Sequence, residues 1–436
     1  MGASKVLEKT LDEILSAIKP SREDQIARNQ IIAELQTVVR SMDIFRGAIV
    51  EPFGSFVSGL FTRWGDLDIS IELPNGSYIS STATEQKQRM LSFLHSRLIG
   101  RYQRLQFIST ARVPIVKFES RSISCDVSID NLSGQMKSKL LLWIKGIDER
   151  FGDMVLLVKE WAKAQEINNS TSGSFNSYSL TLLVIFHFQT CVPAILPPLK
   201  DIYPGDIASD LKGVRADVVQ RITETCTANI ARWKSNRYRL VNQSSLSELL
   251  VSFFSKFSDI GRKARDPVIC PYTGKWEALR SNSRWLLQPD AIFIEDPFER
   301  LENAARTVKA SQMKISEAFE TSYRRVSSTY QTKDSLLPGL ARPSVLMRLP
   351  LELPAPRAFG EGRDLCPDLG RGHAGPRHRS AGATGPDQPS PTSPTMEGRW
   401  PPPPPSSSFP CFRFCFCFCF YFFLFFVFLF FVVLFF

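Results

Sequence analysis

Three aspartates on two short strand-like runs could together bind divalent cations. Asp66 and Asp68 open an alternating run, and Asp126 lies in a second run, at 123–129. Because strand side chains alternate between faces, Asp66 and Asp68 point the same way. Carboxylates that converge from neighbouring strands suit Mg²⁺ or Mn²⁺, and two such ions can activate an attacking hydroxyl and neutralise a leaving pyrophosphate. Asp130 shares a face with Asp126, so the identity of the third acid stays open.

A Gly-Ser pair upstream would supply the phosphate-binding half of such a site. Gly54 and Ser55 follow a β-rich run, and Ser55 lies eleven residues before Asp66. Glycine allows the backbone to approach a ligand closely, and N–H groups at the start of a helix bind phosphate. An Asp-x-Asp on an exposed strand is usually only a solvated face, so the prediction depends on the combination.

The elements that must position these residues can be predicted from hydrophobic periodicity. Helical spacing covers 5–41, β-rich runs follow from Gly47, and a helix is expected at 84–98. Strands are expected at 113–118 and 123–129. The remaining predicted elements are helices, at 137–144, 151–164, 178–190, 216–233 and 245–257. This order predicts an α+β fold, a mixed sheet with helices followed by a helical domain.

Five segments follow from this pattern and from the composition. They are N-terminal helices at 1–41 that pack on the helical domain, a catalytic domain at 42–135, a helical central domain for nucleotide recognition at 136–335, a disordered Pro/Gly/Arg-rich tail at 336–410, and an apolar Phe-rich segment at 411–436. The tail assignment rests on 17 of the 29 prolines, which fall between Pro338 and Pro410.

The apolar segment is long enough to cross a membrane, since 23 uninterrupted apolar residues run from Phe414 to Phe436. Its composition is also what translation of pyrimidine-rich DNA, such as a retained intron, would give. We favour that interpretation and expect no membrane partner.

Several classes of protein are disfavoured. The first 340 residues hold four widely spaced cysteines, which supports neither a disulfide scaffold nor a zinc finger. They contain only two histidines, which argues against His-based nucleophilic or zinc chemistry. Residues 1–9 have no apolar run, so no secretory signal is expected. The net charge of +10 suits a polyanionic partner but is by itself weak evidence.

The motifs together resemble a known family. Residues 54–60 followed by 66–68 look like the signature of the polymerase-β-type nucleotidyltransferases, specifically the noncanonical poly(A)/poly(U) polymerases. Residues 159–163, 176–179 and 294–299 resemble that family in order and spacing, and the resemblance covers about residues 5 to 330. Two longer stretches, 186–199 and 246–254, resemble the plant enzymes that uridylate unmethylated small RNAs.

The resemblance implies a fold, an activity and partners. The fold would be a polymerase-β-like palm with a helical central domain. The activity would be template-independent addition of UMP from UTP to RNA 3′ ends by a two-metal mechanism, with an ATP-using poly(A) polymerase as the alternative. The partners would be a single-stranded RNA 3′ end, a nucleoside triphosphate and a small-RNA effector protein, in nucleus and cytoplasm.

The resemblance also implies a role for each matching residue. The metal-binding and catalytic residues would be Asp66, Asp68 and Asp126. The nucleotide-binding residues would be Gly54, Ser55, Lys159, Lys163, Ser177, Tyr178, Asp296 and Glu299. Without the family, the two lysines read as a solvated helix edge, Tyr178 as a core residue, and Asp296 and Glu299 as an acidic helix start after Pro297.

Two positions depart from the family pattern. UTP-preferring members often carry a histidine six residues after the Asp of the Asp-Pro-Phe-Glu motif, where this chain has Glu302. An ionised carboxylate cannot donate to uracil O4, so uridine preference rests on the overall resemblance. Lys137 stands in or near the place of the usual Asn, and the ribose contact is not carried over. Lys137 and Arg63 are assigned instead to RNA or phosphate, with Trp64, Arg112 and Lys117 as further candidates.

Two other classes of function remain open. A glycosyltransferase also uses an Asp-x-Asp for a metal and a nucleotide sugar, but it predicts a βαβ beginning and no upstream Gly-Ser. An inactive RNA-binding or adaptor module is disfavoured because all three acids are present.

Overall fold

The computed structural model describes residues 3–74, 78–79, 82–260, 267–281, 283–286, 292–300, 302–309 and 312–349. The predicted apolar segment at 411–436, and the predicted tail from residue 350 onward, lie outside the described residues. Two large hydrophobic cores organise the part that is described, one around a β-sheet and one within a group of helices, and a small third cluster joins Val268, Trp285 and Phe293.

The sheet has five strands in the order β1-β2-β5-β4-β3. They are β1 (Ile49–Phe53), β2 (Leu67–Glu72), β3 (Gln103–Ile108), β4 (Ile115–Ser120) and β5 (Ile123–Ile129). Strands β2 and β5 pair in parallel and every other pair is antiparallel, so the predicted mixed sheet is confirmed. The parallel pair sets the site, because its register places Asp68 directly beside Asp126.

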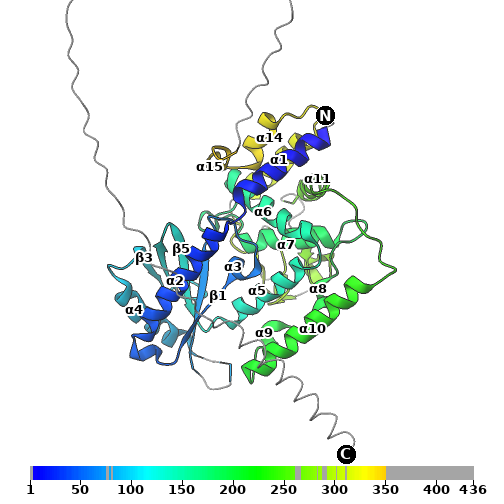
Figure 1. Ribbon diagram of the computed structural model, residues 1–436. Helices are drawn as coiled ribbons and strands as arrows, with labels where there is room; N and C mark the ends of the chain where they lie inside the picture. Colours follow the sequence, from blue (N-terminus) through cyan, green and yellow to red (C-terminus); the bar gives the residue numbers. More distant parts are fainter. Residues whose placement is uncertain are drawn as a thin grey trace, which may run out of the picture. The chain divides into compact units, whose positions relative to one another are not determined.

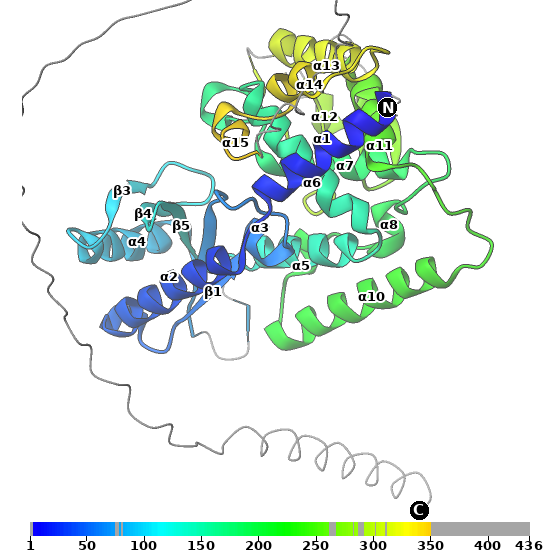
Figure 2. The same ribbon diagram turned by 45° about the horizontal axis from the view of Figure 1, so that its top comes forward.

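Helices α2 (Arg22–Arg40) and α4 (Thr84–Leu98) share the core of the sheet. Figure 1 labels β1, β3 and β5, and α2 and α4 lie beside them. Helix α4 has the bounds predicted from the sequence. The helix α1 (Ala3–Ile18) instead packs against the helical core, beside α6 and α11 (Figure 2). The prediction that residues 1–41 pack on the helical domain is therefore right for α1 and wrong for α2. The apolar face of α2, which includes Ile31 and Leu35, packs on the sheet instead.

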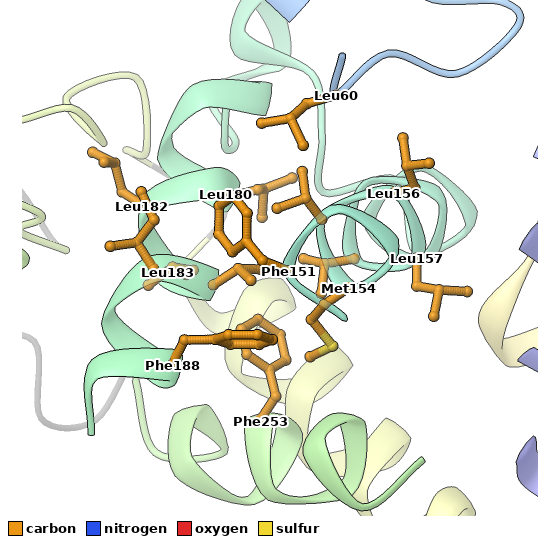
Figure 3. Close-up of a cluster of buried hydrophobic side chains, with 14 of the residues drawn as sticks. Leu60, Phe151, Met154, Leu156, Leu157, Leu180, Leu182, Leu183, Phe188 and Phe253 are labelled. Atoms are coloured by element: carbon orange, nitrogen blue, oxygen red, sulfur yellow. The ribbon is translucent and has the colours of Figure 1, made fainter. Parts of the chain in front are cut away.

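The longer helices of the helical core are α5 (Leu132–Lys145), α6 (Glu149–Ala164), α7 (Ser177–Gln189), α10 (Arg215–Ser235), α11 (Leu246–Phe257), α13 (Gln312–Val326) and α14 (Lys333–Leu340). Eleven consecutive residues of α7, from Ser179 to Gln189, are buried, as befits a helix that is packed all round. Figure 3 shows the contact between α6 and α7, where Phe151 and Met154 lie near Leu180, Phe188 and Phe253.

Short elements complete the described chain. They are α3 (Gly54–Ser58), α8 (Leu199–Ile202), α9 (Ile207–Asp210), α12 (Ser283–Leu286), α15 (Pro343–Leu346), strands β6 (Pro267–Cys270) and β7 (Lys275–Ala278), and single 3₁₀ turns at Asp43–Phe45, Ser170–Ser172 and Leu279–Ser281. Strands β3, β6 and β7 and helices α13 to α15 were not predicted. No helix among the described residues is long and apolar enough to cross a membrane.

The ordered fold extends further than the sequence suggests. The predicted disordered tail begins at residue 336, but the second half of α14 and all of α15 lie beyond that point, so the boundary is wrong for residues 336–349. Leu336, Leu337 and Leu340 are buried in the helical core, and Thr332 caps α14. Pro343 suits its place at the first position of α15, whereas Pro338 lies inside α14, where it has no N–H to donate to the helix.

Candidate active site

The parallel pairing of β2 with β5 brings the predicted acids together. Asp68 and Asp126 are register partners, and Asp66 immediately precedes β2. Burial raises the pKa of the Asp68 carboxyl to about 7, and the charges of Asp126 and Asp66 add to that rise. Loss of solvation likewise raises the pKa of Asp66. The charges of neighbouring aspartates thus contribute to the raised pKa values of Asp66 and Asp68. A bound cation would reduce this repulsion.

The structure also identifies the third acid. Asp130 lies in a turn with a φ of 47°, and its carboxylate accepts hydrogen bonds from the Leu73 N–H at 2.9 Å and the Thr82 hydroxyl at 3.0 Å. Asp130 therefore stabilises a loop, and Asp126 is the acid next to Asp68.

Lys117 is a member of this group that sequence reasoning placed only among RNA contacts. It is the register partner of Asp126 on β4, and its Nζ lies 2.8 Å from Asp126 Oδ1. We call Asp66, Asp68, Asp126 and Lys117 the aspartate end. Lys117 is the only cation in this group that is ion-paired with an acid among the described residues, while Lys159 and Lys163 act on Asp68 and Asp66 through their charge.

The aspartate end fits divalent cations by its chemistry. Carboxylate oxygens are the hard donors that Mg²⁺ and Mn²⁺ take, and burial together with the charges of Asp126 and Asp66 raises the pKa of Asp68, which a bound cation would offset. Within the described ranges, no three carboxylate, thiol or imidazole groups form a ready-made metal cluster, and Asp126 is ion-paired with Lys117. The residues that would hold the cations are the three aspartates.

Gly54 is required by how closely the backbone approaches Asp68. It has a φ of +70°, and a Cβ at this position would lie 1.8 Å from Asp68 Oδ2. Its N–H donates to the Ser138 hydroxyl of α5 at 2.6 Å, which fixes the start of α3. Ser138 is a site residue that the sequence did not suggest, and no sequence signal marked it.

A cavity of about 340 Å³ connects most of the predicted residues. The predicted residues that line it are Gly54, Ser55, Asp66, Asp68, Lys137, Lys159, Lys163, Ser177 and Tyr178. Asp126, Asp296 and Glu299 lie next to lining residues rather than on the wall itself. Arg63 lies apart from the cavity wall and is ion-paired with Asp24 at 3.5 Å, so its assignment to RNA stays a prediction.

The two lysines of α6 face inward, not to solvent. Lys159 is buried, donates to the Leu60 carbonyl at 2.8 Å, and burial lowers its pKa to about 8. Burial also lowers the pKa of Lys163. Between them, buried Glu160 accepts two hydrogen bonds from the Arg342 guanidinium, at 2.8 and 2.9 Å. The solvated-edge reading of this helix is therefore wrong, and the pairing explains why residues beyond 335 are ordered.

Tyr178, at the start of α7, marks the other end of the cavity. Its hydroxyl donates to Asp296 Oδ1 at 3.0 Å. Lys137 Nζ lies 2.8 Å from Asp296 Oδ2, 2.9 Å from Glu299 Oε1 and 5.4 Å from the centre of the Tyr178 ring. Arg112, from the loop between β3 and β4, pairs with Glu299. We call these five residues the tyrosine end.

The tyrosine end also corrects one expectation. No helix begins directly after Pro297, because residues 297–300 form turns in which Asp296 accepts the Phe298 N–H at 2.9 Å. Lys137 is held by the two acids, and its predicted contact with RNA or phosphate stays a prediction. Although burial acts to raise it, Lys137 and Arg112 lower the pKa of the Glu299 carboxyl.

Comparisons with known proteins agree with this geometry. Residues 7–145 match the model of the central palm domain of mitochondrial-like poly(A) RNA polymerases. Over 333 residues the chain is 55% identical to Protein HESO1 of Arabidopsis thaliana, covering 75% of this chain and 65% of that protein. Over 341 residues it is 27% identical to human Poly(A) RNA polymerase GLD2, covering 76% of this chain and 65% of that one. The chain thus spans about two thirds of the length of these relatives.

A solved structure also resembles the fold. A cytoplasmic RNA terminal U-transferase superposes on 78% of this chain and 99% of its own, with a TM-score of 0.59 and 25% sequence identity. The similarity extends over both the sheet and the helical core, since 78% of the chain exceeds either part alone.

Proposed function

We propose that this chain is a noncanonical poly(A)/poly(U) polymerase of the polymerase-β type, and more narrowly a template-independent RNA 3′-terminal uridylyltransferase, which adds UMP from UTP. The observation that carries this proposal is the β2–β5 register. It places Asp68 beside Asp126 at one end of a cavity that has a stacking ring, Tyr178, at the other.

The residues divide the work along the cavity. Asp66, Asp68 and Asp126 would hold divalent cations, which when bound would lower the barrier to attack at phosphorus and neutralise the leaving group. The RNA 3′-oxygen attacks the α-phosphorus, the bond to the β-phosphate oxygen breaks, pyrophosphate leaves, and one aspartate takes the proton of the hydroxyl. Lys159 and Lys163 bind the phosphates, aided by the close approach of Gly54 and Ser55.

The other end of the cavity would hold the base. The Tyr178 ring can stack on any base. The hydrogen bond from its hydroxyl to Asp296 fixes the ring in place. Ser177 lines the cavity next to Tyr178, and its hydroxyl is within hydrogen-bond distance of the Asn168 side chain. Asp296 and Glu299 act through Lys137 and Tyr178.

An extension assay tests the activity. The protein is incubated with a labelled single-stranded RNA oligonucleotide, each nucleoside triphosphate in turn, and Mg²⁺ or Mn²⁺. We expect extension mainly with UTP, and none for Asp66→Ala, with an unchanged circular dichroism spectrum for that variant. If no nucleotide extends the RNA with the unaltered protein, the proposal is wrong.

The poly(A) alternative is kept because two observations favour it. Glu302 replaces the histidine of many UTP-preferring members, and the human relative is named a poly(A) RNA polymerase. Extension mainly with ATP in the same assay would select it.

We further propose small RNAs as the substrate, a small-RNA effector protein as a partner, and residence in nucleus and cytoplasm. The support is the resemblance of residues 186–199 and 246–254 to plant small-RNA uridylyltransferases. Incubation of the purified chain and UTP with unmethylated and 3′-methylated small RNAs tests the first part, since only the unmethylated RNA should be extended.

A further inference from the structure

Lys137 lies where a bound base would be read. It lines the cavity, its side chain is only 19% exposed, and its ammonium is 5.4 Å from the centre of the Tyr178 ring. A base stacked on that ring would lie about 3.5 Å from it, at ordinary van der Waals separation. An ammonium over the ring at 5.4 Å from its centre can therefore approach such a base.

The Lys137 ammonium also has one N–H donor that no described acceptor uses. An ammonium group carries three N–H donors. Two of them are used by Asp296 Oδ2 at 2.8 Å and Glu299 Oε1 at 2.9 Å, and no third acceptor for it is found among the residues that the structure describes. Because these two acids hold the group from the helical side, the remaining donor is oriented before any nucleotide binds, which lowers the entropy cost of binding.

Glu302 is not placed for this task. Its side chain is 44% exposed, lies 3.6 Å from the Arg112 guanidinium, and does not line the cavity. The residue at the histidine position thus pairs with Arg112 at the outer edge of the tyrosine end, and a hydrogen-bond donor for the base must come from another residue.

The chemistry of the bases makes a donor selective. Uracil presents carbonyl oxygens at positions 2 and 4, which accept hydrogen bonds. Adenine has no carbonyl group and presents an amino group where uracil has O4. A buried ammonium facing an amino group would be left without an acceptor, and such unpaired buried groups account for strong discrimination.

Resting on the proposed uridylyltransferase activity, we propose that Lys137 is the residue that selects uracil in this chain. Its ammonium, held between Asp296 and Glu299, donates a hydrogen bond to a carbonyl oxygen of the base that stacks on Tyr178.

The test compares Lys137→Met with Lys139→Met, a matched control on the same helix whose side chain does not line the cavity. The kcat/KM for UTP and for ATP is measured for each full-length variant with a labelled RNA oligonucleotide. We expect the UTP-to-ATP ratio to fall at least tenfold in Lys137→Met, as loss of a charge-assisted hydrogen bond predicts, and to stay within about twofold in Lys139→Met.

A second measurement does not depend on folding of a variant. Replacing a carbonyl oxygen of UTP by sulfur weakens the acceptor, so the unaltered protein should use either 2-thio-UTP or 4-thio-UTP severalfold less well than UTP. The analogue that is discriminated against names the carbonyl that Lys137 contacts, and Lys137→Met should lose that discrimination.

Three outcomes are informative. If Lys137→Met loses activity equally with all nucleotides, or if neither thio analogue is discriminated against, the inference is wrong and Lys137 only orders the site. If the unaltered protein shows no UTP preference at all, the proposed uridylyltransferase function has failed instead. A selective fall in the ratio with matching loss of thio discrimination supports both.

Discussion

The two ends of the cavity both gather carboxylates, but they balance the charge differently. At the tyrosine end, Asp296 and Glu299 are paired with Lys137 and Arg112, and the pKa of Glu299 is lowered. At the aspartate end, burial and mutual repulsion outweigh the nearby ammonium groups of Lys117, Lys159 and Lys163, and the pKa values of Asp66 and Asp68 are raised. The opposite directions indicate that the carboxylate Glu299 is neutralised within the protein, whereas the carboxylates of the aspartate end favour added positive charge.

This difference matches two tasks, recognition of the base at the tyrosine end and the chemical step at the aspartate end. A neutralised network keeps a fixed arrangement of donors and acceptors, which suits recognition of a base. Carboxylates that repel one another favour the binding of cations. This suits a site that is completed only when cations and the nucleotide bind. The following predictions test whether the ends differ in this way.

The largest expected effect concerns the identity of the third acid. Asp126→Asn should reduce RNA extension roughly 1000-fold or more, because several kcal/mol of transition-state stabilisation depend on the cations that the acid would hold. Asp130→Asn is the matched control, four residues away, and should keep most of the activity while losing some stability through its contacts to Leu73 and Thr82. Comparable losses for both variants in the extension assay would contradict the assignment.

Stability should change with opposite signs at the two ends. Asp296→Ala leaves the buried Tyr178 hydroxyl and one side of Lys137 without an acceptor and should lower the free energy of unfolding by about 2–4 kcal/mol. Asp68→Asn removes an unbalanced charge, so without divalent cations it should leave stability unchanged or raise it.

Urea unfolding without Mg²⁺ measures both changes. The addition of Mg²⁺ should then stabilise the unaltered protein and not Asp68→Asn, since only what binds the folded state shifts the equilibrium. If both variants are destabilised equally, the negative charge of the aspartate end is already neutralised within the protein.

The sequence predicts the aspartate end better than the tyrosine end, for a physical reason. Asp66 and Asp68 are two apart on one strand, and period-two alternation alone places them together. The choice between Asp126 and Asp130 depends on the register of β5 with β2. The sequence of one strand alone does not reveal that register. Lys117 likewise joins the group only through its pairing on β4.

Long-range contacts account for most of what the sequence missed. Lys137, Arg112 and Asp296 are brought together from three separate segments. The pairing of Glu160 with Arg342 spans 182 residues and brings a proline-containing segment into the fold. Local composition favours disorder there, and tertiary burial of Leu336 and Leu340 decides against it.

Between the two ends, Lys159 gives the cavity a pH dependence. Its pKa of about 8 lies below that of a free lysine, so it loses its proton as the pH rises through 8. The KM for UTP should therefore rise above pH 8, by up to about tenfold per pH unit, because the neutral amine no longer attracts the phosphates. Lys159→Arg stays charged and should show a flatter profile over the same range.

The same shift has the opposite effect on stability. Between about pH 8 and pH 10.5 the unfolded chain binds more protons at Lys159 than the folded chain does, so the contribution of Lys159 to the free energy of unfolding increases with pH. If the KM for UTP rises with pH while the free energy of unfolding does not fall, unfolding is excluded as the cause of the higher KM. A flat KM up to pH 10 would contradict the role of Lys159 in phosphate binding.

The smallest effect is expected for Arg112, the outermost member of the tyrosine end. Its side chain is 50% exposed, and ion pairs at such positions contribute about 0–1 kcal/mol. Arg112→Gln should change stability by no more than that. It should also raise the KM for UTP about two- to fivefold, because Glu299 without Arg112 attracts the Lys137 ammonium more strongly and draws it away from the base. If instead Arg112→Gln lowers the UTP-to-ATP ratio as strongly as Lys137→Met, base reading resides in the palm loop that carries Arg112. The tyrosine end would then be complete only when that loop is in place, and the contrast between a self-sufficient end and a dependent end would fail.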